Sequence, residues 1–409
     1  MKLSLGQPEM VRAAIMAQPP PSPPTMPAST TVQRLYHLDA ARALLLLLGL
    51  PFHVATKAIF ESEPPAIAFQ ISQVIGGYLS VTHVFRMFAF FMLAGYFAGM
   101  MRERKGARVW LHERARRLGL PLVASLATVG VIQFQLQALV LHKPSPRFLG
   151  MPLALDHLWF LIVLLGYCVC YAAIPIHRIT AGPRIQRAML LCGPGALGLM
   201  LALGGWGIVR IISELWVPPI PDAPFETLLW QQFVFHAAGF IVGVLAWHGR
   251  IGDQVFALRH WVIWPAIALL LLVLIPLDPL IRPALGMEIY PDETGLWIMR
   301  TIELPLAYLM SLGSFRILAL LVKGPSRTIR FFVDGALAIY LFHLVWAMVI
   351  LPHIRATPLL PELQWLLATG IVLMLSCASY VAVRATNITS ILFCGTPAKQ
   401  TLRHKGKTP

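Results

Sequence analysis

The sequence contains few charged residues for its length. Asp, Glu, Lys and Arg make up 12% of its 409 residues, and hydrophobic residues make up 57%. Soluble proteins carry about 25% charged residues. The composition therefore excludes an ordinary soluble multidomain protein. Repeated apolar segments of roughly 20 residues predict an all-α polytopic membrane protein embedded in a lipid bilayer.

Several chemical signatures are also missing. None of the five cysteines forms a C-x-x-C pair, so we expect no disulfide framework and no metal site. The motifs G-x-S-x-G, G-x-x-x-x-G-K-[ST] and H-E-x-x-H are absent, so serine hydrolase, P-loop and zincin functions lack support. The net charge of +15 lies in alternate loops between apolar segments, which argues against a nucleic-acid partner.

About ten transmembrane helices are predicted from the apolar segments. They cover residues 38–59, 84–101, 118–140, 157–175, 188–209, 232–248, 260–276, 297–319, 331–351 and 364–383. Residues 66–82 are moderately apolar and predict a surface helix or an extension of the second span. The resulting domains are a disordered Pro-rich tail over 1–33, a membrane domain over 34–384 and a basic tail over 385–409.

The distribution of basic residues predicts the orientation in the membrane. Most of the 33 Lys and Arg residues fall in the tails and in alternate loops, with a dense group in residues 102–117. Cytoplasmic loops carry an excess of Lys and Arg. We therefore expect both termini to be cytoplasmic, and the N-terminus shows no signal peptide.

Arg42 and His53 are the first candidate functional residues, because both lie in the apolar first span. Eleven residues correspond to about three helical turns, so both side chains share one face and lie roughly 16 Å apart along the axis. Pro51 predicts a kink beside His53. Ionisable residues inside a membrane are functional candidates, although Asp39 and Arg42 could also form a simple surface ion pair.

Polar residues in other spans extend this set. Arg86 enters the second span, and Arg114, Arg116 and Arg117 open the third, where guanidinium groups suit a polyphosphate ligand. His157 and Trp159 open the fourth span at the expected outer surface, where an aromatic belt would explain Trp159 alone. Tyr340 and His343 lie one turn apart at the depth of His53. Glu303 follows Arg300 by three residues, which predicts an ion pair.

Five elements of the sequence resemble acyltransferase family 3 of integral-membrane proteins. They are Arg42 with His53, Arg86 to Tyr96, Arg116 to Pro121, residues 157–161 and residues 339–343. The last two are most similar to the glucans biosynthesis protein C branch. One departure is Ala94, where the family usually has Ser. The single asparagine, Asn387, disfavours the other large class of membrane O-acyltransferases, which pairs a His with an Asn.

The resemblance implies transfer of an acyl group, most simply succinyl, from cytoplasmic acyl-CoA (succinyl-CoA or acetyl-CoA) to a periplasmic glucan or other polysaccharide. It implies a multi-pass protein of the bacterial inner membrane without a bound cofactor. His53 would be the general base. Arg42 would contact the donor together with the Arg114–Arg117 group. Arg86, His157, Trp159 and Tyr340 would face the acceptor or acyl group, and His343 would line the reaction chamber.

Two other function classes remain compatible with the residues. A transporter or flippase could use Arg42, His53 and His343 as a proton relay, although no internal repeat is visible. A scaffold for glucan export would need no catalytic residue. Homo-oligomerisation is possible in each case.

Overall fold

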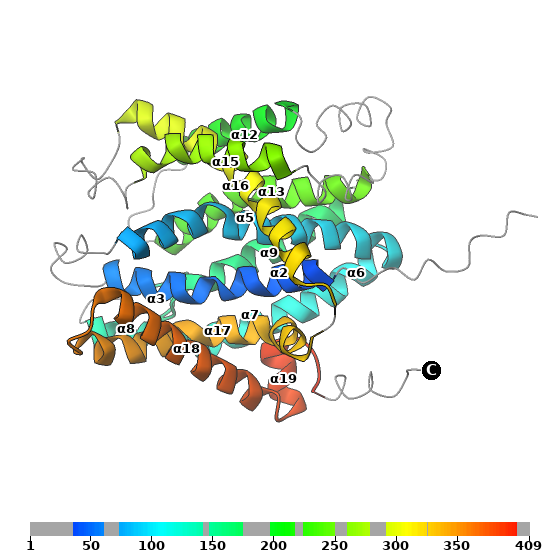
Figure 1. The fold of residues 1–409 in the computed structure, drawn as a ribbon. Helices are drawn as coiled ribbons and strands as arrows, with labels where there is room; N and C mark the ends of the chain where they lie inside the picture. The colour runs from blue at the N-terminus through cyan, green and yellow to red at the C-terminus, as the bar shows by residue number, and fades with distance from the viewer. Residues whose placement is uncertain are drawn as a thin grey trace, which may run out of the picture. The chain divides into compact units, whose positions relative to one another are not determined.

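The computed structural model describes residues 36–60, 73–141, 147–174, 197–216, 224–249, 260–278, 292–324 and 326–398. Every named element over these residues is a helix, as predicted (Figure 1). The Pro-rich tail and the end of the basic tail lie outside the described residues. Residues 387–394 of the predicted basic tail form helix α19 (Asn387–Cys394).

Within the described ranges, eight helical segments are long and apolar enough to cross a membrane. They are Tyr36–Lys57, Val74–Lys105, Ala107–Leu139, Asp156–Ala173, Pro224–His248, Glu293–Leu321, Arg327–Arg355 and Pro361–Val383. Each overlaps one of the ten predicted spans. The other two predicted spans overlap α12 (Leu197–Trp216) and α15 (His260–Leu274), and the apolar stretch Ile263–Leu277 at α15 is shorter than a full span. The chain is therefore an all-α polytopic membrane protein.

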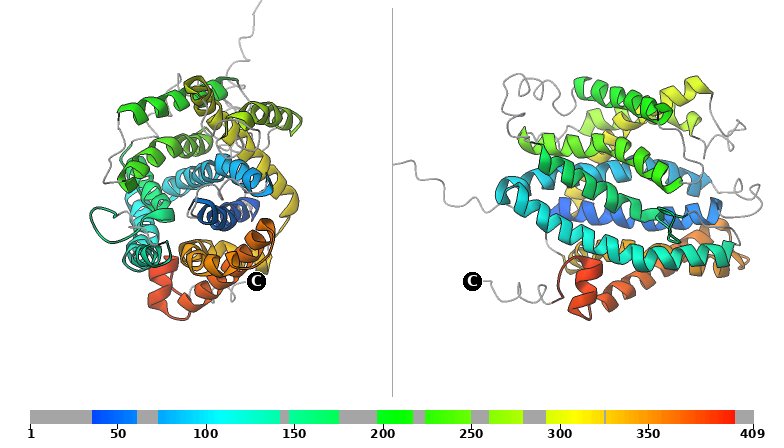
Figure 2. Two further views of the ribbon diagram at one scale, coloured as in Figure 1. Left: turned by 90° about the vertical axis from the view of Figure 1, so that its left-hand side faces the viewer. Right: turned by 180° about the vertical axis from the view of Figure 1, so that it is seen from behind.

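The first span is divided into α2 (Tyr36–Leu47) and α3 (Gly49–Phe60). Pro51 has no N–H for the carbonyl one turn earlier, which weakens the helix at this point. In the end-on view, α2 and α3 are encircled by the other helices (Figure 2, left). Among their neighbours are α16 (Glu293–Leu321), α17 (Arg327–Arg355) and α18 (Pro361–Val383).

The second span is α5 (Gln73–Lys105), which includes residues 73–82 of the predicted extension. It packs most closely on α13 (Pro224–His248). A Cβ atom at Gly95 would lie 2.1 Å from the Phe240 carbonyl oxygen, and one at Gly243 would lie 1.9 Å from that of Met92. Glycine at these positions lets the two backbones approach directly, as small residues do in membrane helix pairs.

The third span bends through two π-helical turns. It runs through α6 (Ala107–Arg114), α7 (Leu120–Ser125) and α8 (Val131–Leu141), joined by π-turns at Ala115–Gly119 and Leu126–Gly130. Pro121 cannot donate to the Arg117 carbonyl. Gly395, with φ of +67°, packs against that carbonyl, where a Cβ would lie 2.4 Å away. Thus α19 contacts the turn that carries Arg116 and Arg117.

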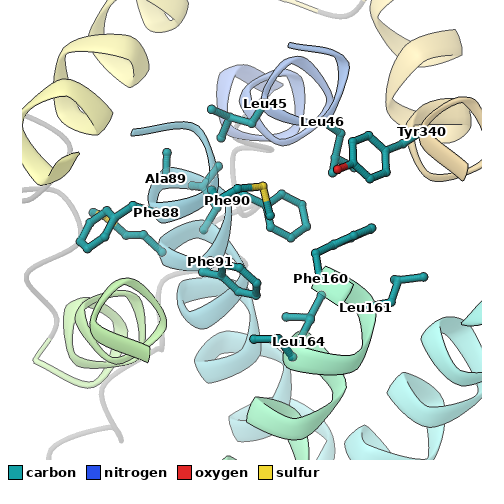
Figure 3. Close-up of a cluster of buried hydrophobic side chains, with 14 of the residues drawn as sticks. Leu45, Leu46, Phe88, Ala89, Phe90, Phe91, Phe160, Leu161, Leu164 and Tyr340 are labelled. Atoms are coloured by element: carbon teal, nitrogen blue, oxygen red, sulfur yellow. The ribbon is translucent and has the colours of Figure 1, made fainter. Parts of the chain in front are cut away.

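A large apolar core connects these helices (Figure 3). Phe90 of α5 packs edge-on against Phe160 of α9 (Trp159–Ala173), and Phe88 and Phe91 of α5 belong to the same core. Tyr340 of α17 lies at the edge of this cluster beside Leu46 of α2. The core therefore holds α2, α5, α9 and α17 together, with the side chain of Tyr340 at its edge.

Candidate functional site

His53 lies on α3, one turn after the interruption in the first span. Its Nε2 atom is hydrogen-bonded to the phenol oxygen of Tyr340 at 3.3 Å. Gly49 makes this approach possible, because a Cβ there would lie 2.6 Å from Cε2 of Tyr340 and 3.2 Å from Nη1 of Arg86. The broken span therefore brings His53 directly against α17.

His343 lies on the same face of α17 as Tyr340 and is fully buried. The ring centroids of His53 and His343 are 5.2 Å apart. Nδ1 of His343 donates a hydrogen bond to the backbone carbonyl of Tyr340. The spacing of Tyr340 and His343 on one helical face thus brings both side chains to His53.

His157, predicted where the fourth span opens at the outer surface, is buried inside the protein, with 1% of its surface exposed. Its ring centroid lies 4.9 Å from that of His343, 5.2 Å from that of Tyr340 and 6.3 Å from that of His53. The short 3₁₀ turn Asp156–Leu158 before α9 turns the side chain inward. We call His53, His157, His343 and Tyr340 the histidine cluster.

Backbone carbonyls determine the tautomers of two of these histidines. A carbonyl only accepts hydrogen bonds, so Nδ1 of His343 and Nε2 of His157, which is 3.1 Å from the Leu341 carbonyl, must carry protons. In the neutral rings, Nε2 of His343 and Nδ1 of His157 then bear lone pairs. Both atoms are buried and have no hydrogen-bond partner among the described residues. The cluster therefore presents two unused proton-accepting nitrogens.

Arg86 is a buried cation beside this cluster, with 4% of its surface exposed. Its guanidinium lies over the Phe52 ring at 4.5 Å, and Nη1 donates to the Leu48 carbonyl at 3.4 Å. Its Nε atom has no partner, and no carboxylate pairs with it within the described part of the chain. A buried cation without a counter-charge is costly unless a ligand supplies one.

Asp156, the residue before His157, forms polar contacts with Gln137 and Lys57. The carboxylate of Asp156 accepts a hydrogen bond from Gln137 at 2.9 Å and lies 3.8 Å from Nζ of Lys57. Asp156 has φ of +28°, a strained value for a residue with a side chain. These contacts hold the strained turn that orients the neighbouring His157. One signal in the sequence pointed to this role: an aspartate that an aromatic belt does not explain.

The predicted donor residues gather away from the histidine cluster. Arg42 lies 3.7 Å from Asp39, so the expected surface ion pair is present, and its guanidinium lies over Phe97. The positive charges of Arg42 and Arg117 lie near enough to Arg114 to repel its guanidinium. Arg116 and Arg117 are exposed on the π-turn. The structure therefore separates Arg42 from His53 and associates it with the arginine group.

Trp159 also lies outside the histidine cluster. Its ring stacks on His236 of α13, with centroids 5.4 Å apart. His236 was not among the predicted site residues, because its neighbours in the sequence are apolar and give no pattern. No group of three or more His, Cys, Asp or Glu side chains within the described ranges is arranged to hold a metal ion.

Comparisons with known proteins agree with this architecture. The model of acyltransferase family 3, described as an acyltransferase domain, matches residues 35–383. The chain is 27% identical over 233 residues to glucans biosynthesis protein C of Shigella boydii serotype 4 (strain Sb227) and of Escherichia coli (strain SMS-3-5 / SECEC). It is 28% identical to that of Escherichia coli O157:H7 (strain EC4115 / EHEC).

Each of these alignments covers 52% of this chain and 58% of the relative's length. No solved structure matches the chain. The family model, in contrast, spans most of the sequence and includes every member of the histidine cluster. The chain belongs to acyltransferase family 3.

Proposed function

We propose that this protein is a membrane O-acyltransferase that transfers an acyl group, with succinyl as the first candidate, from acyl-CoA to a hydroxyl of a periplasmic glucan. The observation that carries the proposal is the histidine cluster beside the buried Arg86, which has no carboxylate partner among the described residues. Family membership supports acyl transfer. The name of the relatives, glucans biosynthesis protein C, supports a glucan acceptor.

In the proposed reaction, His53 removes the proton from the acceptor hydroxyl. The alkoxide oxygen attacks the thioester carbonyl carbon, an ester bond forms, and the carbon–sulfur bond breaks to release coenzyme A thiolate. The proton on His53 then passes to the thiolate. A positioned base of this kind typically contributes about 10²–10⁴-fold to the rate. The nearby lone pairs of His157 and His343 provide further acceptors for the hydroxyl hydrogen.

The buried guanidinium of Arg86 supports succinyl as the acyl group. A succinyl thioester ends in a free carboxylate, and an arginine fork binds carboxylates through two parallel hydrogen bonds. Arg86 lies next to Tyr340, and its Nε atom has no partner among the described residues. A bound carboxylate would supply the missing counter-charge while the thioester reaches the histidine cluster. An acetyl group would leave Arg86 unpaired.

The arginine group around Arg114 suits the nucleotide end of coenzyme A. The charge of Arg42 lies near that of Arg114. Arg116 and Arg117 are exposed and can bind phosphates. With the termini in the cytoplasm, this group faces the cytoplasmic pool of acyl-CoA. Arg42 begins the span that leads to His53, so the donor enters along the first span. The protein would then act in the bacterial inner membrane.

The direct test replaces His53 by Ala in the full-length protein, reconstituted in lipid vesicles with labelled succinyl-CoA and a glucan. We expect transfer to fall by about 10²-fold or more. His353→Ala is the matched control, because this histidine lies on α17 but is exposed. Normal transfer by His53→Ala, or no transfer by the unmodified protein, would contradict the proposal. Mass spectrometry of the glucan identifies the acyl group.

A further inference from the structure

A second polar group lies among the membrane helices and is not used by the proposed chemistry. Arg210 of α12 donates to Glu214 at 2.9 Å and to Glu303 of α16 at 2.7 Å. Arg300 donates to the same oxygen of Glu214 at 3.1 Å. We call these four residues the ion network. The predicted pair between Arg300 and Glu303 is therefore wrong, because each residue pairs with α12 instead.

The ion network is not fully satisfied by its own contacts. Glu303 is buried, and only its Oε2 atom takes part in the hydrogen bonds formed among the described residues. The Arg210 guanidinium lies 4.1 Å from the centre of the Phe235 ring. A clamp between two helices requires only the Oε2 atom of Glu303, and its Oε1 atom forms no hydrogen bond among the described residues. That oxygen is a free acceptor for a ligand.

Two histidines extend this group. His236 follows Phe235 on α13, is 4% exposed, and has a buried Nδ1 atom without a partner in the described part of the structure. The charge of Arg210 acts on it. The side chain of His83 on α5 is exposed. It lies within electrostatic range of Glu303, Arg86 and Arg210. Polar side chains from α5, α12, α13 and α16 thus converge, and among them His236 has an unused nitrogen within the described residues.

The second group is continuous with the histidine cluster. The ring of His83 stacks on that of Phe52, with centroids 5.7 Å apart, and Phe52 meets His53 edge-on at 5.3 Å. The guanidinium of Arg86 also lies over the Phe52 ring, 4.5 Å from its centre. A ligand bound near His83 therefore has a short route to the proposed base.

Charge decides which ligand suits this site. The ion network contains two cations and two anions, so it offers no net attraction for a polyphosphate or a carboxylate. Alternating donors and acceptors beside the aromatic rings of Phe52, Phe235 and Trp159 suit the hydroxyls and C–H faces of an uncharged sugar. Leaving such groups inside a membrane domain is costly, which favours a functional role.

We propose that the ion network, His83 and His236 form the docking site for the acceptor, an uncharged saccharide chain, and present one of its hydroxyls to the histidine cluster. This inference rests on the proposed function, because it assigns the second substrate of that reaction. It places acceptor recognition on Glu303 and His236, which the sequence did not indicate as substrate-binding residues.

The test measures binding of a neutral gluco-oligosaccharide to the full-length protein in lipid nanodiscs. His236→Phe retains a ring that can stack on Trp159 but removes both nitrogens, and Glu303→Gln keeps the shape but removes the charge. We expect each to weaken oligosaccharide binding by about tenfold or more, as for a lost buried hydrogen bond. Glu293→Gln is the control, because Glu293 is exposed in the first turn of the same helix, α16, and lies outside the ion network; it should change the affinity by less than about threefold.

Three results would overturn the inference: no oligosaccharide binding by the unmodified protein, unchanged binding by His236→Phe and Glu303→Gln, or an equal loss in Glu293→Gln. Coenzyme A binding checks that each variant is folded, and His236→Phe decides the matter where Glu303→Gln does not fold. His53→Ala separates the two proposals, since it should lose transfer and keep oligosaccharide binding. If no acyl transfer is found but the binding pattern holds, the proposed function fails and the saccharide site remains.

Discussion

The phenol oxygen of Tyr340 lies 3.3 Å from Nε2 of His53, although 287 positions separate the two residues. The contact joins the first span to α17 and contributes two of the four members of the histidine cluster. Because Tyr340 is buried and Gly49 leaves room for its ring, the hydroxyl has a defined position. It can orient the imidazole of His53 toward a substrate hydroxyl.

Tyr340→Phe should lower the rate of acyl transfer by about tenfold, because it removes one hydrogen bond to the base. The ring itself remains packed edge-on against Phe160. We therefore expect the thermal midpoint of unfolding to change little. The measurement is kcat for transfer from acyl-CoA together with a melting curve.

Tyr308→Phe is the matched control. Tyr308 is buried on α16, and its hydroxyl has no partner among the described residues. Its removal should leave the transfer rate unchanged. Equal effects of the two substitutions would mean that the bond to His53 has no catalytic role.

Arg42→Lys should raise KM for acyl-CoA by about tenfold and change kcat less. Lysine keeps the positive charge but loses the planar fork that binds phosphate oxygens in pairs. Arg330→Lys serves as the control, because Arg330 is exposed near the start of α17. An unchanged KM in Arg42→Lys would exclude bidentate phosphate binding by this residue.

Asp156→Ala should reduce transfer more than Asp156→Asn. Alanine removes the contacts with Gln137 and Lys57 and is strained at φ of +28°, a cost of about 1–3 kcal/mol. Asparagine tolerates such a φ and keeps a side-chain oxygen for Gln137. We expect at least about a tenfold difference in kcat between the two variants, measured at equal amounts of folded protein. Equal rates would show that this turn does not position His157.

Gly95→Ala should destabilise the membrane domain by about 1–3 kcal/mol, because its methyl group would strike the Phe240 backbone, which cannot rotate away. Gly77→Ala on the same helix has no heavy atom within 4 Å of the added Cβ. It should be neutral or stabilise the helix by up to about 1 kcal/mol. Thermal unfolding in the same detergent compares the two. A loss of stability in Gly77→Ala equal to that in Gly95→Ala would contradict the direct packing of α5 on α13.

The helices could be predicted because their signal is local. A run of apolar residues must satisfy its backbone hydrogen bonds internally in lipid, and only a helix does this within one segment. The same argument makes an arginine or histidine in such a run conspicuous. Arg42, His53, Arg86 and His343 were all recognised in this way.

The partners of these residues were harder to predict. His157 was predicted at the opening of the fourth span, where an aromatic belt does not explain it, but its burial against Tyr340 and His343 could not be predicted from the sequence. Glu303 was paired with Arg300 by sequence spacing, but it bonds Arg210 on another helix. His236 lies in the predicted span 232–248 and carried the same signal as the other intramembrane histidines, but no motif singled it out, and a histidine between apolar residues does not indicate its neighbours.

The sequence by itself determined the all-helical membrane architecture, the separation of basic residues from apolar spans, and the intramembrane histidines and arginines. These properties depend on composition and on the 3.6-residue helical period. Only the tertiary structure decided that three histidines and Tyr340 meet, and that Glu303 pairs with Arg210 on α12 instead of with Arg300. The physical reason is that close packing, as at Gly95 and Gly243, determines which helices are neighbours. This packing acts between residues far apart in the chain.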